Sequence, residues 1–415
     1  PYRRQRQMCI RDRSKRVLSL WNRTLFLYLT SYMGYSDFPL DVLKSVKTPF
    51  YYYDKGLLLQ TLRAVDATAG RYGYKIHYAV KANANPEILR LIESFGLGAD
   101  CVSGGEINAA LSAGFPAGKI VYAGVGKNDW EIELALKNGI ACFNVESLEE
   151  LRVIDELAGI HGKIAPVALR INPNVDAHTH EYITTGLDEN KFGIELALLD
   201  KVLDELPGLR NVMLKGIHFH IGSQILNMDS YAVLCDRIND IQQQFEKRGI
   251  SLSIINVGGG LGVDYDKPDE NPIPDFASYF EVFHTHLHLR KGQEVHFELG
   301  RSIVCQCGSL ISKVLYVKKG VNKNFVILDA GMTDLIRPAL YKAHHKIENI
   351  TSESLSMERY DVVGPICESS DCFGKEECLR ETKRGDLVAI RSAGAYGEIM
   401  ASQYNCRSLP ESILL

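Results

Sequence analysis

The sequence predicts an α/β protein, a parallel (β/α)8 barrel with a second, mainly β domain. Apolar runs suited to buried strands alternate with helix-like patterns from Tyr51 onward, and ionisable residues repeatedly follow those runs. After Arg301 the pattern changes to strand-like segments separated by turns. The chain has 415 residues, which is enough for a barrel of about 250 residues and one further domain.

Eight apolar runs predict the barrel strands, at residues 76–81, 98–102, 120–123, 140–145, 166–171, 216–221, 254–258 and 294–299. Helix-like patterns lie between them, at residues 86–94, 105–113, 129–137, 147–157, 196–206, 230–247 and 275–289. We therefore expect the barrel at residues 55–300 and the β domain at residues 35–54 together with 301–415.

The charge is unevenly distributed along the chain. The formal net charge is −4, but residues 1–34 alone carry eight Lys or Arg and one Asp, so the remaining chain carries −11. An acidic body without a basic stripe argues against nucleic acid as a partner. The apolar run within the basic head is interrupted by Asn22 and Arg23, is too short to span a bilayer and precedes no A-x-A-like cleavage site. We expect residues 1–34 to be extraneous or disordered, and a genuine targeting segment stays open as the alternative.

The ten cysteines form neither a disulfide framework nor a zinc pattern, because no C-x-x-C occurs. We expect reduced thiols, no bound metal, no membrane association and a cytoplasmic location.

The predicted strand ends carry a set of polar residues. In parallel barrels chemistry gathers at the carboxyl ends of the strands, so a cleft is expected there. These ends are Lys81, Asp100, Gly124, Glu146, Asn172, His220, Gly258-Gly259-Gly260 and Glu298.

Lys81 follows the apolar run I-H-Y-A-V and precedes the small residues Ala82, Asn83 and Ala84. A half-buried ammonium is costly unless it is paired or neutralised. The chemical interpretation is a lysine of lowered pKa, held for Schiff-base formation. The alternative is a lysine that snorkels to solvent from a strand end.

Three further motifs carry residues that could act together with Lys81. Gly258-Gly259-Gly260 offers backbone N–H groups to a phosphate, although a plain tight turn is the alternative. In H-F-H-I-G-S-Q, His220 could face a ligand or be a satisfied core histidine, and a metal site with His218 lacks a third ligand. In F-E-L-G-R, Glu298 could hold a ring nitrogen protonated beside an anion loop, or simply pair with Arg301.

Together these features describe a pyridoxal phosphate site. The motifs Y-A-V-K-A-N, H-I-G-S-Q, V-G-G-G-L-G, C-E-S-S-D and A-Y-G are specific in combination. From about Phe38 to Leu415 the chain resembles the diaminopimelate decarboxylases. These belong to the barrel-plus-β-domain family that includes alanine racemase and eukaryotic ornithine decarboxylase.

The resemblance implies roles for individual residues. Lys81 would bind pyridoxal 5'-phosphate covalently, His220 would stack on its ring and Glu298 would pair with the ring nitrogen. The phosphate or its loop would contact Ser223, Gly259, Gly260, Gly300 and Tyr396. Substrate would contact Arg301, Arg337, Tyr341, Glu368 and Tyr396. Cys367, as the acid that protonates Cα, and Glu368 would come from a second subunit of a homodimer with shared active sites.

The implied activity is decarboxylation of meso-2,6-diaminopimelate to L-lysine and CO2, the last step of lysine biosynthesis. A decarboxylase of ornithine, arginine or carboxynorspermidine on the same fold, or a catalytically dead binding homologue, stays open. A racemase is disfavoured by C-E-S-S-D and by the insertion at residues 173–193. Leu299 stands where the family usually has proline, so we expect a looser anion loop.

Overall fold

The computed structural model describes residues 38–175 and 191–415. Contacts divide it into two compact units, residues 1–46, which include helix α2 (Leu40–Leu43), and residues 47–415, to which everything below refers. The basic head at residues 1–34 and most of the insertion at residues 173–193 lie outside the described residues. Within the described ranges, no helix is long and apolar enough to cross a membrane.

Eight parallel strands close into a barrel in chain order, which confirms the predicted fold class. They are β2 (Lys75–Ala79), β3 (Gly98–Cys101), β4 (Ile120–Tyr122), β5 (Cys142–Val145), β6 (Ala165–Arg170), β7 (Val212–His218), β8 (Ile254–Asn256) and β9 (Glu294–Leu299). The barrel closes where β2 pairs with β9, with His77 opposite Glu298 and Tyr78 opposite Leu299. This register brings the turn after β2 beside the end of β9.

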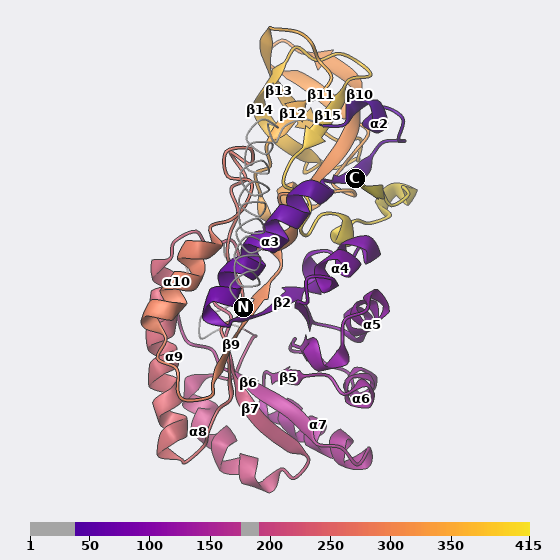
Figure 1. Ribbon diagram of the computed structural model, residues 1–415. Coiled ribbons are helices and arrows are strands. Elements are labelled where there is room, and N and C mark those ends of the chain that lie inside the picture. The colour runs from indigo at the N-terminus through magenta and orange to yellow at the C-terminus, as the bar shows by residue number, and fades with distance from the viewer. Residues whose placement is uncertain (1–37, 176–190) are drawn as a thin grey trace, which may run out of the picture. The chain divides into compact units, whose positions relative to one another are not determined.

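Helices follow the strands on the outside of the barrel (Figure 1). They are α4 (Pro86–Glu93), α5 (Gly104–Ala113), α6 (Asp129–Asn138), α7 (Leu148–Ile160), α8 (Leu196–Glu205), α9 (Asp229–Lys247) and α10 (Phe276–His286). Their starts agree with local capping chemistry. The side chains of Asn85 and Ser147 accept N–H bonds at the first turns of α4 and α7, and Asn128 with Glu131 forms a capping box at α6.

A further helix, α3 (Lys55–Tyr72), precedes β2 and is not among the predicted helices. Its signals were present. Asp54 caps the helix by accepting the N–H of Leu57 at 2.8 Å, and Gly73 ends it in a left-handed conformation with φ of 70°. Leu58, Leu62, Val65 and Ala69 then form one buried stripe at helical spacing.

Six of the eight predicted barrel strands end earlier in the structure, and for two of them this changes the placement of a site residue. Strand β2 ends at Ala79, and Lys81 lies in a following 3₁₀ turn, η1 (Val80–Ala82). The buried side chain of Asn83 fixes this turn by donating to Gly394 O at 2.9 Å and to the Tyr53 hydroxyl at 2.8 Å. Strand β7 ends at His218, two residues before His220. Both side chains therefore extend from connecting loops.

The remaining strands form a mainly β sheet with the order β12-β15-β10-β11-β13-β14. These are β10 (Gly308–Lys319), β11 (Asn324–Leu328), β12 (Ile347–Asn349), β13 (Met357–Val363), β14 (Cys372–Arg380) and β15 (Leu387–Ile390), with short helices α11 (Arg301–Val304) and α12 (Arg337–Tyr341) in the connections. Strand β1 (Phe50–Tyr53) pairs with β10 and with β16 (Glu411–Leu414), so a segment from before the barrel joins this sheet. The exact limits of 35–54 and 301–415 as a domain stay a prediction.

Strand β9 connects the core to the site through its alternation of side chains. Phe297 is fully buried and packs edge-on against Phe280 and Phe283 of α10, with ring centroids 4.9 and 5.0 Å away. Its removal would cost about 3–5 kcal/mol of stability. The next residue, Glu298, points to the opposite face of the strand. Packing of the outer layer therefore holds Glu298 toward the barrel interior.

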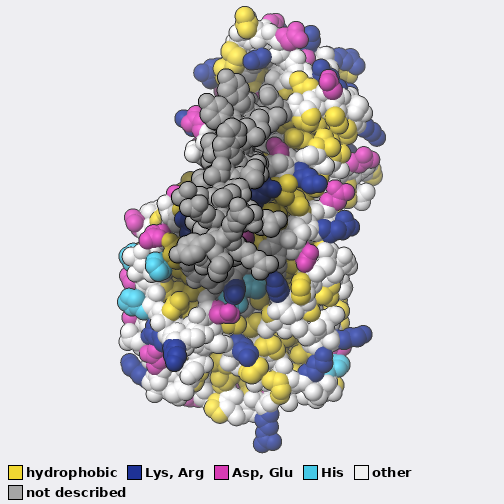
Figure 2. Space-filling view, viewed as in Figure 1, with side chains coloured by type: hydrophobic (Ala, Val, Ile, Leu, Met, Phe, Trp, Pro, Cys, Tyr) yellow, Lys and Arg dark blue, Asp and Glu magenta, His cyan; other side chains and the backbone are white. Residues whose placement is uncertain are grey.

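The surface of the described residues carries both signs of charge. On the face drawn in Figure 2, Lys and Arg side chains are interspersed with Asp and Glu.

Candidate active site

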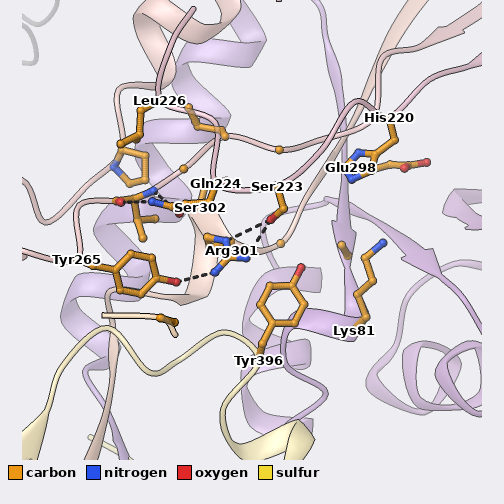
Figure 3. Close-up of a pocket in the computed structure, with 18 of the residues that line it drawn as sticks. Lys81, His220, Ser223, Gln224, Leu226, Tyr265, Glu298, Arg301, Ser302 and Tyr396 are labelled. Atoms are coloured by element: carbon orange, nitrogen blue, oxygen red, sulfur yellow. Dashed lines mark hydrogen bonds between the residues drawn. The ribbon is translucent and has the colours of Figure 1, made fainter. Parts of the chain in front are cut away.

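A cavity of about 1180 Å³ opens at the carboxyl ends of the barrel strands. Barrel residues that line it include Lys81, Arg170, His220 and Glu298, and the later part of the chain contributes Arg337, Tyr341 and Tyr396. In Figure 3, Lys81, His220 and Glu298 lie on one side of the pocket, and Arg301, Ser223 and Tyr265 extend toward the other. The cavity therefore has an end with an amine and a carboxylate and an end rich in guanidinium groups.

Lys81 is paired with Asp100. Its Nζ lies 3.8 Å from Oδ2 of Asp100, a fully buried residue whose carboxylate oxygens accept no hydrogen bond from the described residues. Burial alone would lower the pKa of Lys81, but Asp100, Tyr396 and Glu298 outweigh it and raise the pKa above 10.5. The predicted lowering is therefore wrong. Lys81 is held as an ammonium and must lose a proton before it can act as a nucleophile.

Glu298 is held by three donors. Oε1 accepts from the side-chain amides of Asn144 at 2.9 Å and Asn256 at 2.8 Å, and Oε2 accepts from His218 Nε2 at 2.9 Å. Burial alone would raise the pKa of Glu298, but the charge and hydrogen bond of His218, together with Lys81, lower it. The carboxylate is therefore ionised and fixed in direction.

Asn144, Asn256 and His218 are not among the partners predicted for Glu298. A weak signal existed, because an asparagine interrupts each of the apolar strand runs C-F-N-V and I-I-N-V. An amide buried in a barrel strand needs a partner inside the barrel. Which carboxylate it meets follows only from the closed barrel.

His220 is a neutral histidine beside the glycine loop. Its Nδ1 accepts the N–H of Gly259 at 3.2 Å, so the ring proton is on Nε2. Burial, Lys81 and Arg170 hold the pKa of His220 well below 6.5. The ring can therefore face a ligand without bringing a positive charge.

Close backbone contacts require glycine in the loop Gly258–Gly260. A Cβ at Gly259 would lie 1.9 Å from Glu298 O, and one at Gly260 would lie 2.6 Å from Gly222 O. Gly258 and Gly260 also have positive φ, 71° and 108°. Gly260 lines the cavity, whereas Gly259 donates its N–H to Nδ1 of His220.

Two buried arginines form the other end of the cavity. Arg301 donates to Ser223 Oγ at 3.0 Å and to the Tyr265 hydroxyl at 2.6 Å, and Arg337 donates to His345 Nε2 at 3.0 Å. Their residues are 6% and 5% exposed, yet in the described part of the chain neither has a carboxylate within 4.0 Å. A buried unpaired guanidinium is costly, so this end of the cavity is suited to an anionic ligand.

A family model described as "Pyridoxal-dependent decarboxylase, pyridoxal binding domain" matches residues 58–305. The chain belongs to the pyridoxal-dependent decarboxylases. The match covers the barrel and extends through α11, so it includes Lys81, the glycine loop and Glu298.

Other decarboxylases of this family match most of the chain. A diaminopimelate decarboxylase of Bacteroides thetaiotaomicron is 62% identical over 375 residues, which are 90% of this chain and 97% of that protein. The crystal structure of a Helicobacter pylori diaminopimelate decarboxylase complexed with L-lysine has a TM-score of 0.85 at 43% identity, and covers 90% of this chain and 93% of that one. The crystal structure of a diaminopimelate decarboxylase from m. jannaschii, also in complex with L-lysine, has a TM-score of 0.83 at 34% identity, and covers 90% of this chain and 88% of that one.

Most residues predicted for the site meet in the cavity of this decarboxylase, although their roles stay predictions. Its lining includes Lys81, His220, Ser223, Gly260, Glu298, Gly300, Arg301, Arg337, Tyr341 and Tyr396. Cys367 and Glu368 do not line it. Both are exposed on the connection between β13 and β14, where Glu368 accepts a hydrogen bond from the Tyr404 hydroxyl at 2.8 Å.

Proposed function

We propose that this chain catalyses the pyridoxal phosphate-dependent decarboxylation of meso-2,6-diaminopimelate to L-lysine and CO2, the last step of lysine biosynthesis. The observation that carries the proposal is the pair of buried arginines, Arg301 and Arg337, without a carboxylate partner among the described residues. Diaminopimelate has a second carboxylate that would pair with them, and ornithine has none. The matched relatives named diaminopimelate decarboxylase support the same substrate.

The residues present fit pyridoxal 5'-phosphate. Lys81 offers an amine to the cavity, His220 offers a neutral flat ring, and Glu298 offers an ionised carboxylate for a ring nitrogen. Ser223, Gly260 and Gly300 line the cavity, and the two glycines have no side chain that would keep an anion away from the backbone. When bound, the cofactor supplies an electron sink for the electrons that the departing carboxylate leaves behind.

The protein's own groups prepare this chemistry. Glu298, kept ionised by His218 and two asparagines, would hold a proton on the ring nitrogen it faces. Lys81 would transfer its proton before binding, and Asp100 is the carboxylate 3.8 Å from its Nζ. Arg301, Arg337 and Tyr341 would bind the distal carboxylate and so orient the other end of the substrate toward Lys81.

We also propose a cytoplasmic homodimer with shared active sites. Cys367 and Glu368 are exposed and lie outside the cavity lining of their own chain, which supports their acting in a partner's site. There the Cys367 thiol would donate the proton to Cα, and Glu368 would bind the distal ammonium. The cysteines of the described residues are free, as suits a reducing compartment.

The test is release of CO2 and L-lysine from meso-diaminopimelate, compared with release of CO2 from ornithine and arginine. Loss of the buried guanidinium in Arg337→Ala should raise KM for diaminopimelate by about 10–100-fold, and that for ornithine far less. Arg237→Ala, an exposed arginine of α9, is the matched control. A wild-type enzyme that uses ornithine as efficiently as diaminopimelate would overturn the substrate assignment and leave the family unchanged.

A further inference from the structure

Tyr265, in the loop after β8, is in contact with both buried arginines. The guanidinium carbons of Arg301 and Arg337 lie 6.0 and 5.0 Å from the centre of its ring. The Tyr265 hydroxyl accepts a hydrogen bond from Arg301 at 2.6 Å (Figure 3). An aromatic ring attracts cations within about 6 Å of its centre. Tyr265 can therefore stabilise two like charges that would otherwise repel each other.

His345 supports Arg337 from the side away from the cavity. It is fully buried and does not line the cavity. Its Nδ1 donates to Arg391 O at 2.9 Å, which leaves Nε2 as an acceptor for Arg337 at 3.0 Å. Burial and Arg337 lower the pKa of His345 to about 3, so the ring stays a neutral acceptor at working pH. The ring also packs edge-on against Tyr265, 5.2 Å between centroids.

Charged contacts fix Tyr265 and His345 relative to each other. The side chain of Arg391, whose carbonyl binds His345, pairs with Asp269 at 2.8 Å. Asp269 also pairs with Lys346 at 2.7 Å. Asp269 lies in the same barrel loop as Tyr265, whereas Lys346 and Arg391 belong to the β sheet region. These ion pairs therefore connect the loop that carries Tyr265 to the segment that carries His345.

We propose that Tyr265 and His345 are positioning residues that hold Arg301 and Arg337 at the spacing and direction required to bind the distal carboxylate of the substrate. They thereby determine the preference for a substrate that carries this carboxylate. The inference rests on the proposed function, since it takes the two arginines to be the site of that group. Tyr265 touches a guanidinium that lines the cavity, and His345 acts only through Arg337.

A pair of ligands isolates recognition of this carboxylate. L-Lysine, the product, still carries the distal carboxylate of diaminopimelate. Cadaverine is the corresponding diamine without this carboxylate. The ratio of their inhibition constants on the holoenzyme therefore measures what the arginines contribute. A general packing defect would weaken the binding of both ligands alike, whereas misplaced arginines would weaken the binding of L-lysine alone.

The variants remove the two supports separately. Tyr265→Leu removes the ring and the hydroxyl, and His345→Leu removes both hydrogen bonds of the imidazole. Tyr265→Phe keeps the ring, and His345→Gln can still accept from Arg337 and donate to Arg391 O. Tyr316→Leu is the matched control, because Tyr316 is an exposed tyrosine of β10 with Arg384 5.3 Å above its ring.

We expect each leucine variant to reduce the preference for L-lysine over cadaverine by about 10-fold, with KM for diaminopimelate rising more than kcat falls. The Phe and Gln variants should keep most of the preference, and Tyr316→Leu all of it. One folded leucine variant is enough for the decision, because Arg337 is in contact with both supports.

Two outcomes overturn the inference. The leucine variants could retain the wild-type preference, or they could bind L-lysine and cadaverine equally more weakly. Either result would show that Tyr265 and His345 only fill space, and the proposed function would stand. A wild-type enzyme that binds both ligands equally and does not decarboxylate diaminopimelate would overturn the proposed function itself. The wild-type measurement therefore separates the two failures.

Discussion

Lys81 is the cavity residue best suited to bind a carbonyl cofactor, although the structure holds it as an ammonium. Asp100 and Glu298 raise its pKa, so the charged form is a resting state that must give up a proton. A paired lysine is also less prone to react with stray carbonyl compounds. Lys81 must therefore pass a proton to an acceptor before its amine can react, and the Asp100 carboxylate is 3.8 Å from its Nζ.

The first prediction concerns Lys81→Ala. Without this amine, covalent attachment of the cofactor and essentially all activity should be lost, because no other cavity lysine is present among the described residues. Borohydride reduction followed by peptide mapping tests this directly. Lys137→Ala, an exposed helix lysine, is the control. A labelled peptide that contains a different lysine would contradict the assignment of Lys81.

The second prediction concerns Glu298→Gln, which keeps the size of the side chain and removes its charge. The neutral amide would also point one NH2 group at the donors of Asn144, Asn256 or His218, which cannot accept it in their present roles. Turnover should fall on the order of 10²-fold or more, equivalent to roughly 3 kcal/mol of barrier. Glu294→Gln, at the exposed start of the same strand, is the control. Near-normal kcat in Glu298→Gln would mean that another group holds the ring nitrogen.

At the scale of elements, the buried His77 and the partly buried His296 lie where β2 and β9 close the barrel. His77 Nε2 and His296 Nδ1 are 2.9 Å apart, and His77 Nδ1 bonds to Lys119 O at 3.2 Å. Burial lowers the pKa of both to about 4. In the unfolded chain each would titrate near 6.5, so the folded state is stabilised above that pH and loses this stability as pH falls toward 4.

The third prediction follows from this pair. The free energy of unfolding should fall by on the order of 3 kcal/mol for each of these histidines between pH 6.5 and 4. His77→Gln keeps one donor and one acceptor but cannot be protonated, so it should flatten the pH dependence in that range. Urea unfolding at a series of pH values measures the difference, with His161→Gln, an exposed histidine, as control. Equal pH slopes for wild type and His77→Gln would contradict the prediction.

Prediction from sequence succeeded where the signal is local. Strand β9 has the predicted limits, and α4 to α7 start within one residue of the predicted positions, because caps such as Asn85 and Asn128 and the apolar period are readable in short windows. Helix α3 was not named although its cap and stripe are present. Lys81 was assigned to a strand because the side chain that fixes its turn, Asn83, bonds to Gly394, 311 positions away. His220 was likewise assigned to a strand, but it follows the end of β7 and bonds to Gly259 of another loop.

The arginine end of the cavity shows the limit of sequence reasoning. Arg301 and Arg337 were found by resemblance, but Tyr265 and His345 belong to no motif and are 80 residues apart. Their contact exists only because the loop after β8 meets the segment before β12. The pKa of Lys81 was predicted in the wrong direction for the same reason, since Asp100 comes from a neighbouring strand.

At the scale of the whole molecule, three predicted site residues do not line the cavity of one chain, namely Gly259, Cys367 and Glu368. Cys367 and Glu368 lie on an exposed connection outside its lining, while Lys81, Glu298 and both arginines face it. Without them the described lining contains no thiol to protonate Cα and no carboxylate of the β sheet region to bind a distal ammonium. If these groups come from a second copy, each site needs two chains, and a homodimer is obligatory for activity.

The last prediction tests this arrangement by complementation. Lys81→Ala and Cys367→Ala should each be inactive, or nearly so, as homodimers. After mixing and subunit exchange, each hybrid has one site that combines the intact Lys81 of one chain with the intact Cys367 of the other. Random exchange would make half of the dimers hybrids, so activity should return to roughly a quarter of wild type. Differently tagged chains verify the exchange, and Lys81→Ala mixed with itself is the control. If exchange is verified and no activity returns, Cys367 acts in the same chain as its lysine, which would require the exposed connection to move toward its own cavity.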